Sequence, residues 1–391
     1  MIYFTIQSMI FLPVVLFILI LIHFRRKLNF FSLFLIYLDV FFNSRKKRFA
    51  VYFMSFLIPI LIGYLLYKIP SSSDVQIAMT GAIQAFLNGK NPFYYTVVPH
   101  VLLFPSGIKK LVMGTYNYGP IDLLSYSIGY IIFHPFVGSP WWLYFSNLLL
   151  LVGIYLVIRS LIALPDLIKI IPFMIIFSIF LGDNVLLMCF FLSLAWYVHL
   201  KSNYRYKSVL VTFLITLGIL TKLFVAFVLL GYFIYIFRTN LKLWIINAIS
   251  VTITGFLVII PFGILNVIKS IFIFHVDLSV RANYATIQGG LTIYLMLLHL
   301  TSLFIPVAIL LTIFFLYICN KYFEQIELKF GIFTILNLLV LPDSNYAFFI
   351  IPVFFLLLYF YKQLYKNYIL YEKLDDPVLI MDETTNFLKN G

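Results

Sequence analysis

The chain has 391 residues, of which 63% are hydrophobic and 10% are charged, and its mean hydropathy is +1.06. A soluble globular protein of this composition could not cover its surface with polar groups, so that class is excluded. The formal charge of +13 would suggest nucleic acid in a soluble protein, but here the basic residues gather in short segments between apolar runs, where they set topology. The composition therefore predicts an all-α polytopic membrane protein that contacts membrane lipid and binds no nucleic acid, because an apolar run in lipid satisfies its backbone as a helix.

The two cysteines and the first apolar segment give further information about bound groups and about the N-terminus. Cys189 and Cys319 both lie in apolar segments, so we expect no disulfide, no metal site and no cofactor. Residues 6–24 have basic residues after them and none before them, the reverse of a signal peptide. This order predicts a retained anchor helix with its N-terminus outside. Residues 28–42 lie between two basic clusters and are expected to rest on the cytoplasmic surface.

Eleven apolar runs are candidates for transmembrane helices. They are residues 5–24, 49–69, 141–161, 167–181, 184–200, 208–221, 222–237, 243–263, 300–319, 330–342 and 345–361. Several are short for a hydrocarbon layer of roughly 30 Å. Short runs meet in pairs at Gly182-Asp183-Asn184 and at Thr221-Lys222, which predicts a groove or cavity facing outward.

The predicted membrane topology depends on one ambiguous apolar segment. Residues 121–137 are apolar enough either to span or to form a second helix on the outer surface. If they do not span, 20 basic residues lie inside and 7 outside; if they span, the counts become 10 and 17. The positive-inside rule favours the first arrangement. Residues 70–140 are therefore expected to form one long external segment with surface helices.

The external segment opens with a carboxylate and a short amphipathic pattern. After Asp74, one side of the predicted helix is apolar and the other carries Gln76, Thr80, Gln84 and Asn88. That spacing suits a helix on the membrane surface. The sequence Asn88-Gly89-Lys90-Asn91-Pro92 then ends it.

The predicted organisation has four parts. They are an anchor and interfacial helix (1–48), a transmembrane module that includes the external loop 70–140 (49–264), C-terminal transmembrane helices with an external loop 265–290 (265–361), and a cytoplasmic tail (362–391).

Several motifs follow one another in a recognisable order. They are a spanning helix, Asp74, the surface helix with Asn88-Gly89-Lys90-Asn91-Pro92-Phe93-Tyr94, then Tyr116-Asn117-Tyr118-Gly119-Pro120, Gly182-Asp183-Asn184 and Gly218-Ile219-Leu220-Thr221-Lys222. Over roughly residues 50–240 this order resembles the GT-C superfamily of integral-membrane glycosyltransferases, particularly the branch related to polyprenyl-phosphate mannosyltransferases. Residues 283–288 and Ser344-Asn345-Tyr346 are also similar to that branch. The resemblance implies a GT-C-like bundle of about eleven transmembrane helices.

The resemblance also implies a reaction at the extracytoplasmic face of the cell membrane. A polyprenyl-phosphate sugar, a hexose such as mannose, would enter from the bilayer and meet a glycan, lipid or protein acceptor from outside. Asp74 would act as general base of an inverting, metal-independent transfer, Asp183 as a secondary acid, and Lys222 would contact the lipid phosphate. The chain departs from the family where Val75-Gln76 follow Asp74, leaving no paired carboxylate, and where Asn345-Tyr346 replace a common His-Tyr.

Other residues are weaker candidates on chemical grounds. Arg281 could clamp a phosphate bidentately or could be a lone surface arginine. Tyr94 and Tyr118 could stack on sugar or prenyl groups, and Asn91 and Gln288 belong to the resembling motifs as candidate substrate contacts.

Each of the principal residues could also have a purely structural role. Asp74 could be a solvated acid capping a helix, since Ser71-Ser72-Ser73-Asp74 is also an N-cap run. Asp183 could be a turn acid after a glycine, and Lys222 could extend to the surface.

Two further function classes compete with the transferase. A transporter or flippase for lipid-linked glycans should show duplicated halves and ionisable residues at mid-membrane, and no duplication is visible. A polymerase or ligase of lipid-linked glycans would carry its large external loop late in the chain, whereas here the longest loop comes early.

Overall fold

The computed structural model describes residues 74–103, 109–139, 141–164, 166–178, 180–273, 301–338, 340 and 349–372, with the isolated residues Phe49, Phe53 and Leu57. The predicted crossings 5–24 and 49–69, the interfacial segment 28–42 and most of the loop 265–290 lie outside these residues. Arg281, Gln288 and the segment Ser344-Asn345-Tyr346 lie outside them as well.

The main body is a bundle of apolar helices around one core. Its helices are α6 (Trp141–Leu161), α7 (Asp166–Ser178), α8 (Leu186–Lys201), α9 (Lys207–Ile219), α10 (Ala226–Thr239), α17 (Ile326–Leu338) and α18 (Ile350–Glu372). The core they share includes Phe177, Trp196, Phe330 and Phe355, and Trp196 packs its ring edge against the rings of both Phe330 and Phe355. Every residue from Ile350 to Tyr359 is buried, so α18 occupies the centre of the bundle.

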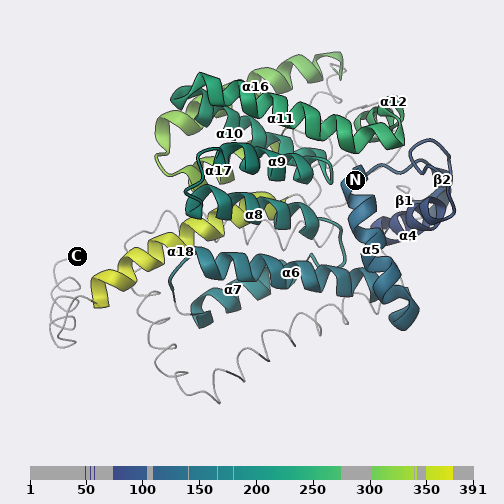
Figure 1. Cartoon of the computed structure of the whole chain (residues 1–391), viewed down its shortest axis with the longest axis horizontal. Helices are drawn as coiled ribbons and strands as arrows, with labels where there is room; N and C mark the ends of the chain where they lie inside the picture. Colours follow the sequence, from purple (N-terminus) through teal and green to yellow (C-terminus); the bar gives the residue numbers. More distant parts are fainter. Residues whose placement is uncertain are drawn as a thin grey trace.

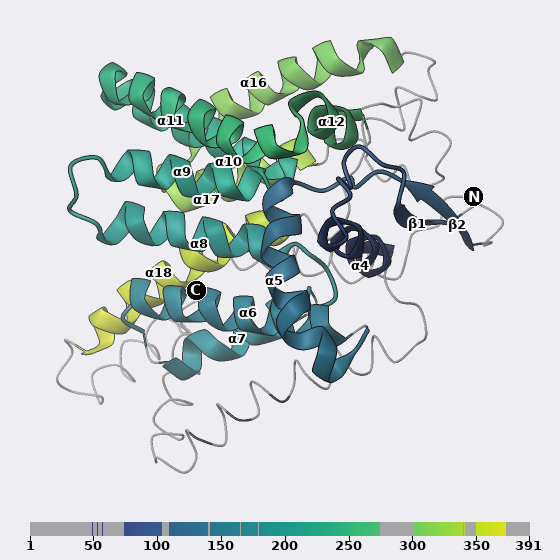
Figure 2. The ribbon, with the colours of Figure 1, turned by 45° about the vertical axis from the view of Figure 1, so that its right-hand side comes forward.

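Two long helices, α11 (Leu241–Ile259) and α16 (Phe304–Tyr322), lie on the outside of the bundle (Figures 1 and 2). Only 11% of the apolar window of each is buried, against 50% for α6. An apolar helix with so little buried surface is suited to lipid rather than water. Within the described residues, α6, α11 with the 3₁₀ turn η2 (Ile260–Phe262), and α16 are long and apolar enough to cross a membrane.

A smaller cap closes one end of the bundle. It consists of α4 (Asp74–Leu87), the antiparallel strands β1 (Val98–Leu103) and β2 (Lys109–Gly114), α5 (Pro120–Val137), α12 (Ile264–Ile268) and the π-helical turn η3 (Lys269–Ile273). A second buried cluster joins the cap to the bundle through Leu123, Trp142, Leu187 and Phe262. The two views show α5 lying across the ends of α6 and α8 (Figures 1 and 2).

Successive helices alternate in direction, so that several of the junctions between them lie together at the capped end. The α7–α8 junction, the α9–α10 junction containing η1 (Leu223–Val225), and η2 all lie there, near α5 (Figures 1 and 2). The α6–α7 and α8–α9 turns lie at the opposite end.

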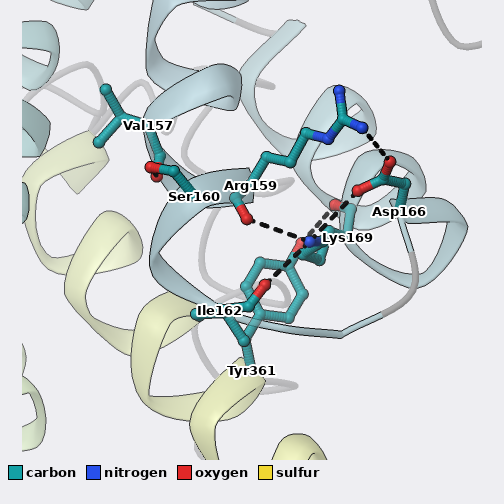
Figure 3. Close-up of polar contacts among 7 residues, drawn as sticks. All are labelled: Val157, Arg159, Ser160, Ile162, Asp166, Lys169 and Tyr361. Carbon is teal, nitrogen blue, oxygen red and sulfur yellow. Dashed lines mark hydrogen bonds and ion pairs between the residues drawn. The ribbon is translucent and has the colours of Figure 1, made fainter.

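The opposite end is fastened by a lysine (Figure 3). The Lys169 ammonium donates to the carbonyls of Arg159 (3.3 Å) and Ile162 (2.9 Å) at the end of α6, and pairs with Asp166 at 3.3 Å. The hydroxyl of Tyr361 donates to the Lys169 carbonyl at 2.6 Å. The Lys169 ammonium stabilises the α6–α7 turn, because a cation at the C-terminal end of a helix satisfies carbonyls that have no partner within the helix. The Tyr361 hydrogen bond then attaches α18 to this turn.

The predicted helices agree with most of the observed elements, and the all-α class is confirmed in outline. The described residues contain three helices of spanning length, so the count of eleven crossings stays a prediction. Residues 121–137 form a helix that is not among the three, and its expected place on the outer membrane surface stays a prediction. Its exposed face carries Ile128 and Phe136, apolar side chains suited to a membrane surface.

Three expectations need correction. The external segment contains a two-stranded sheet in which Val98 pairs with Gly114, where only helices were expected. The predicted tail from residue 362 begins as helix, because α18 continues to Glu372. Gln76, expected on a polar face of α4, is buried and donates to the Ser139 hydroxyl at 3.0 Å, because α4 packs against protein rather than only against lipid.

Candidate functional site

The candidate site lies where the loop before α5 contacts the α9–α10 junction. The Gly119 amide donates to the Thr221 carbonyl at 3.0 Å, and the Ile121 amide donates to the Leu220 carbonyl at 3.1 Å. A Cβ on Gly119 would stand 1.7 Å from the Leu220 oxygen, so only glycine allows this approach. The two segments, a hundred residues apart in sequence, are thereby fixed side by side.

A buried carboxylate, Asp122, follows directly in the first turn of α5. It has no exposed surface, and its Oδ2 accepts hydrogen bonds from the Tyr116 hydroxyl (2.6 Å) and from Asn184 Nδ2 (2.7 Å). Burial raises the pKa of the Asp122 carboxyl to about 7, although the charge of Lys222 and the two hydrogen bonds lower it. Burial and the charge of Asp122 raise the pKa of Tyr116 well above its ordinary value, so its hydroxyl keeps the proton it donates.

A buried cation completes the charge cluster. Lys222 is 5% exposed, and its ammonium lies 3.7 Å from the centroid of the Tyr118 ring, a cation–π contact. Asp183 is 7% exposed, and its Oδ1 accepts the Asn184 backbone amide at 2.7 Å. The charges of Lys222 and Asp183 both act on Asp122, with opposite effects on its pKa. We call Tyr116, Tyr118, Asp122, Asp183, Asn184 and Lys222 the acid–lysine cluster.

Asn147, on α6, holds the α7–α8 junction in place. Its Nδ2 donates to the carbonyls of Leu181 (2.8 Å) and Asp183 (2.7 Å), and its Oδ1 accepts the Tyr126 hydroxyl at 2.5 Å. All the side-chain groups involved are buried. A tight junction between two short helices is thus positioned by side chains of α6 and α5 rather than by its own turn alone.

The first turn of α4 belongs to the same end of the molecule. Val75, next to Asp74, lies in the buried cluster that also contains Leu123, beside Asp122, and Leu187, in the first turn of α8. Asp74 is therefore the first residue of a helix that packs beside the acid–lysine cluster; its side chain lies outside the described atoms.

The structure brings some predicted site residues together and separates others. Asp183, Lys222 and Tyr118 lie in the acid–lysine cluster. Asn91 donates to the Phe262 carbonyl at 2.8 Å and so anchors the turn after α4. Tyr94 is 61% exposed and packs its ring against Tyr95 instead.

Sequence reasoning assigned no role in the site to Asp122 or Asn184. Asp122 stands between Ile121 and Leu123 in an apolar helix. An isolated acid in such a run is a signal in itself, because an unpaired buried charge is costly. Among the described residues no three His, Cys, Asp or Glu side chains gather in a way that could hold a metal ion.

Comparison with known proteins adds no neighbour: no protein-family profile, no curated protein and no solved structure matches the chain.

Proposed function

We propose that the chain is a membrane glycosyltransferase that moves a sugar from a polyprenyl-phosphate donor to an acceptor hydroxyl on the extracytoplasmic face. The observation that carries this proposal is the acid–lysine cluster, in which Asp183, Lys222 and Tyr118 come together from three parts of the chain. A lipid-phosphate donor needs a cation for its leaving group and a carboxylate for the incoming hydroxyl, held in fixed geometry. The cluster supplies the cation, and the carboxylate for the hydroxyl is that of Asp74, the first residue of the helix that packs beside the cluster.

The reaction assigns one role to each of the main residues. The acceptor oxygen forms a bond to the anomeric carbon, the bond from that carbon to the phosphate oxygen breaks, and the acceptor proton passes to the Asp74 carboxylate. The polyprenyl phosphate leaves with the electron pair, its charge balanced by the Lys222 ammonium. The aromatic contact of Tyr118 keeps that ammonium in place while the phosphate exchanges.

The membrane setting supports the same substrate class. The exposed faces of α5, α11 and α16 are apolar, so the body that carries the cluster presents helix faces suited to lipid. A donor with a prenyl chain can reach such a site by moving within the bilayer. A water-soluble nucleotide sugar does not partition into lipid, so the apolar helix faces would not help it to reach the site.

The test is transfer in proteoliposomes supplied with a panel of labelled prenyl-phosphate sugars and with glycan, lipid and peptide acceptors. Wild type is compared with Asp74→Asn, Lys222→Met and a control, Glu324→Gln, which removes an exposed acid. Removing a general base should slow transfer about 10²–10⁴-fold, and the control should match wild type.

The outcomes separate the competing functions. Equal turnover by wild type and Asp74→Asn removes the base assignment. Transfer from none of the donors overturns the proposal. Movement of a labelled lipid-linked glycan between leaflets with its covalent structure unchanged would establish the transporter or flippase instead.

A further inference from the structure

The proposed reaction gives no role to Asp122, the fully buried carboxylate of the acid–lysine cluster. Its Oδ2 is satisfied by Tyr116 and Asn184, but its Oδ1 is buried and has no hydrogen-bond partner among the described residues. A buried acceptor without a partner is costly while the group is ionised, and protonation removes much of that cost. Asp183 differs, because its Oδ1 accepts a backbone amide.

The groups around Asp122 come from every element packed against it. Tyr116 and Tyr118 come from the preceding loop, Tyr126 from α5 itself, Asp183 from the α7–α8 junction, and Lys222 from the α9–α10 junction. α4, which begins at Asp74, packs against α5. Lys222 is the cation whose charge acts on Asp122 and favours its ionised form.

We propose that Asp122 is the proton-binding partner of the anion site at Lys222: when the phosphodiester of a prenyl-phosphate sugar binds the Lys222 ammonium, the Asp122 carboxylate takes up one proton from solvent. The inference rests on the proposed function and names a further positioning residue for the same site. The physical reason is charge balance in a desolvated space. One ammonium cannot balance the charges of Asp122, Asp183 and a third negative group in a desolvated space. The Asp122 carboxylate, whose Oδ1 has no hydrogen-bond partner among the described residues, is therefore the group that is protonated.

The consequence is a donor affinity that depends on pH although the donor itself does not titrate near neutrality. Binding takes up a proton between the pH at which Asp122 ionises in the free protein and the higher pH at which it ionises in the complex. Below this range Asp122 is already protonated, and above it binding is opposed. When the polyprenyl phosphate departs, Asp122 releases the proton to solvent. The Tyr116 and Asn184 hydrogen bonds hold the carboxyl in one orientation through both states.

The experiment is an infrared pH titration of the purified full chain, following the carbonyl stretch that only a protonated carboxylic acid gives. Wild type should show this band at low pH and lose it as pH rises, and Asp122→Asn should remove it. Lys222→Met should move its midpoint upward by about one pH unit or more, a tenfold change in proton affinity. Lys201→Met, which removes an exposed lysine at the other end of the bundle, should leave the midpoint unchanged.

The probe is a short-chain prenyl-phosphate mannose, and its addition should move the same midpoint upward. If the probe binds and the midpoint stays where it was, the inference is wrong while the proposed function stands. If the probe does not bind but Lys222→Met shifts the midpoint, the function is wrong while the Asp122–Lys222 pair stands. An unmoved midpoint in Lys222→Met overturns the pair itself. Should Asp122→Asn fail to fold, Tyr116→Phe identifies the band, because losing the donor changes both its frequency and its midpoint.

Discussion

Asn184 and Asp122 lie 62 residues apart in the sequence and are joined by a buried hydrogen bond of 2.7 Å between Asn184 Nδ2 and Asp122 Oδ2. This bond connects the junction of two short bundle helices to the first turn of the helix that crosses their ends. Charge-assisted bonds of this kind are stronger than neutral ones, and more so away from water. The cap and the bundle therefore act as one unit at the candidate site, and their connections can be tested one at a time.

Replacing Gly119 with alanine should loosen the cap. The added Cβ would overlap the Leu220 carbonyl, so the amides of Gly119 and Ile121 would lose their partners. Each orphaned buried group costs about 1–3 kcal/mol, and we expect a clear fall in the thermal unfolding midpoint in detergent. Gly255→Ala is the matched control, since nothing lies within 4 Å of a Cβ there and alanine favours a helix. Equal midpoints for the two variants would contradict the close approach at Gly119.

Asn147→Asp should destabilise the α7–α8 junction although it barely changes the shape of the side chain. The carbonyls of Leu181 and Asp183 would lose their donor and face a carboxylate instead. We expect a loss of about 2–6 kcal/mol in the free energy of unfolding, the sum for two buried carbonyls left without a donor. Denaturant unfolding measures it, with Asn320→Asp as control because Asn320 bonds only within its own helix, to the Leu316 carbonyl. A similar loss in both variants would argue against a special role for Asn147.

Lys362→Met should lower the free energy of unfolding more than the same substitution at an unpaired surface lysine. Glu327 is 2% exposed, pairs with Lys362 and accepts the Trp196 indole at 3.3 Å, so the variant leaves a buried carboxylate without its cation. Removing one partner of a buried pair costs about 3–5 kcal/mol. The double variant Lys362→Met with Glu327→Leu should recover most of that loss in the same unfolding measurement. A double variant less stable than the single one would contradict this account, because Glu327 would then stabilise the fold without its cation.

The stability of the chain should depend on pH through Asp122. Burial raises the pKa of Asp122 from its ordinary 3.8 to about 7 in the folded protein, so between these values the folded state holds a proton that the unfolded state has lost. The contribution is complete below about pH 4, falls as pH rises, and is gone above about pH 7, at up to about 1.4 kcal/mol per pH unit. Thermal midpoints measured from pH 4 to 8 should fall more steeply in wild type than in Asp122→Asn. Parallel curves would mean that Asp122 is not buried in the folded state.

The helices were predictable because apolar length and charge placement carry most of the signal in such a chain. The helix after Asp74, the breaks at Asp183 and Lys222, and the helix over residues 121–137 all follow from local pattern. The hairpin did not follow, because each strand has only six residues and neither alternates regularly between apolar and polar side chains. Its one signal in the sequence is the turn-forming run Pro105-Ser106-Gly107.

The candidate site was predictable only in part, since sequence shows which residues are unusual but not which of them meet. Lys222 and Asp183 stood out as charges at the ends of apolar runs. Asp122 was also visible as an isolated acid in an apolar run, but its place in the site depends on Tyr116 and Asn184, and nothing local predicts those contacts. Gly119 likewise looks like a turn glycine until Leu220 is seen beside it.

The helix at the centre of the bundle follows α6, α17 and the helices between them in the sequence. Because α18 fills the core from Ile350 to Tyr359 and Tyr361 reaches back to the α6–α7 turn, the earlier helices are synthesised before the piece they surround. A nascent chain that stops before Ile350 would already contain the whole acid–lysine cluster, yet its helices would lack the core against which they pack. The ribosome therefore delivers the centre of this bundle after its walls.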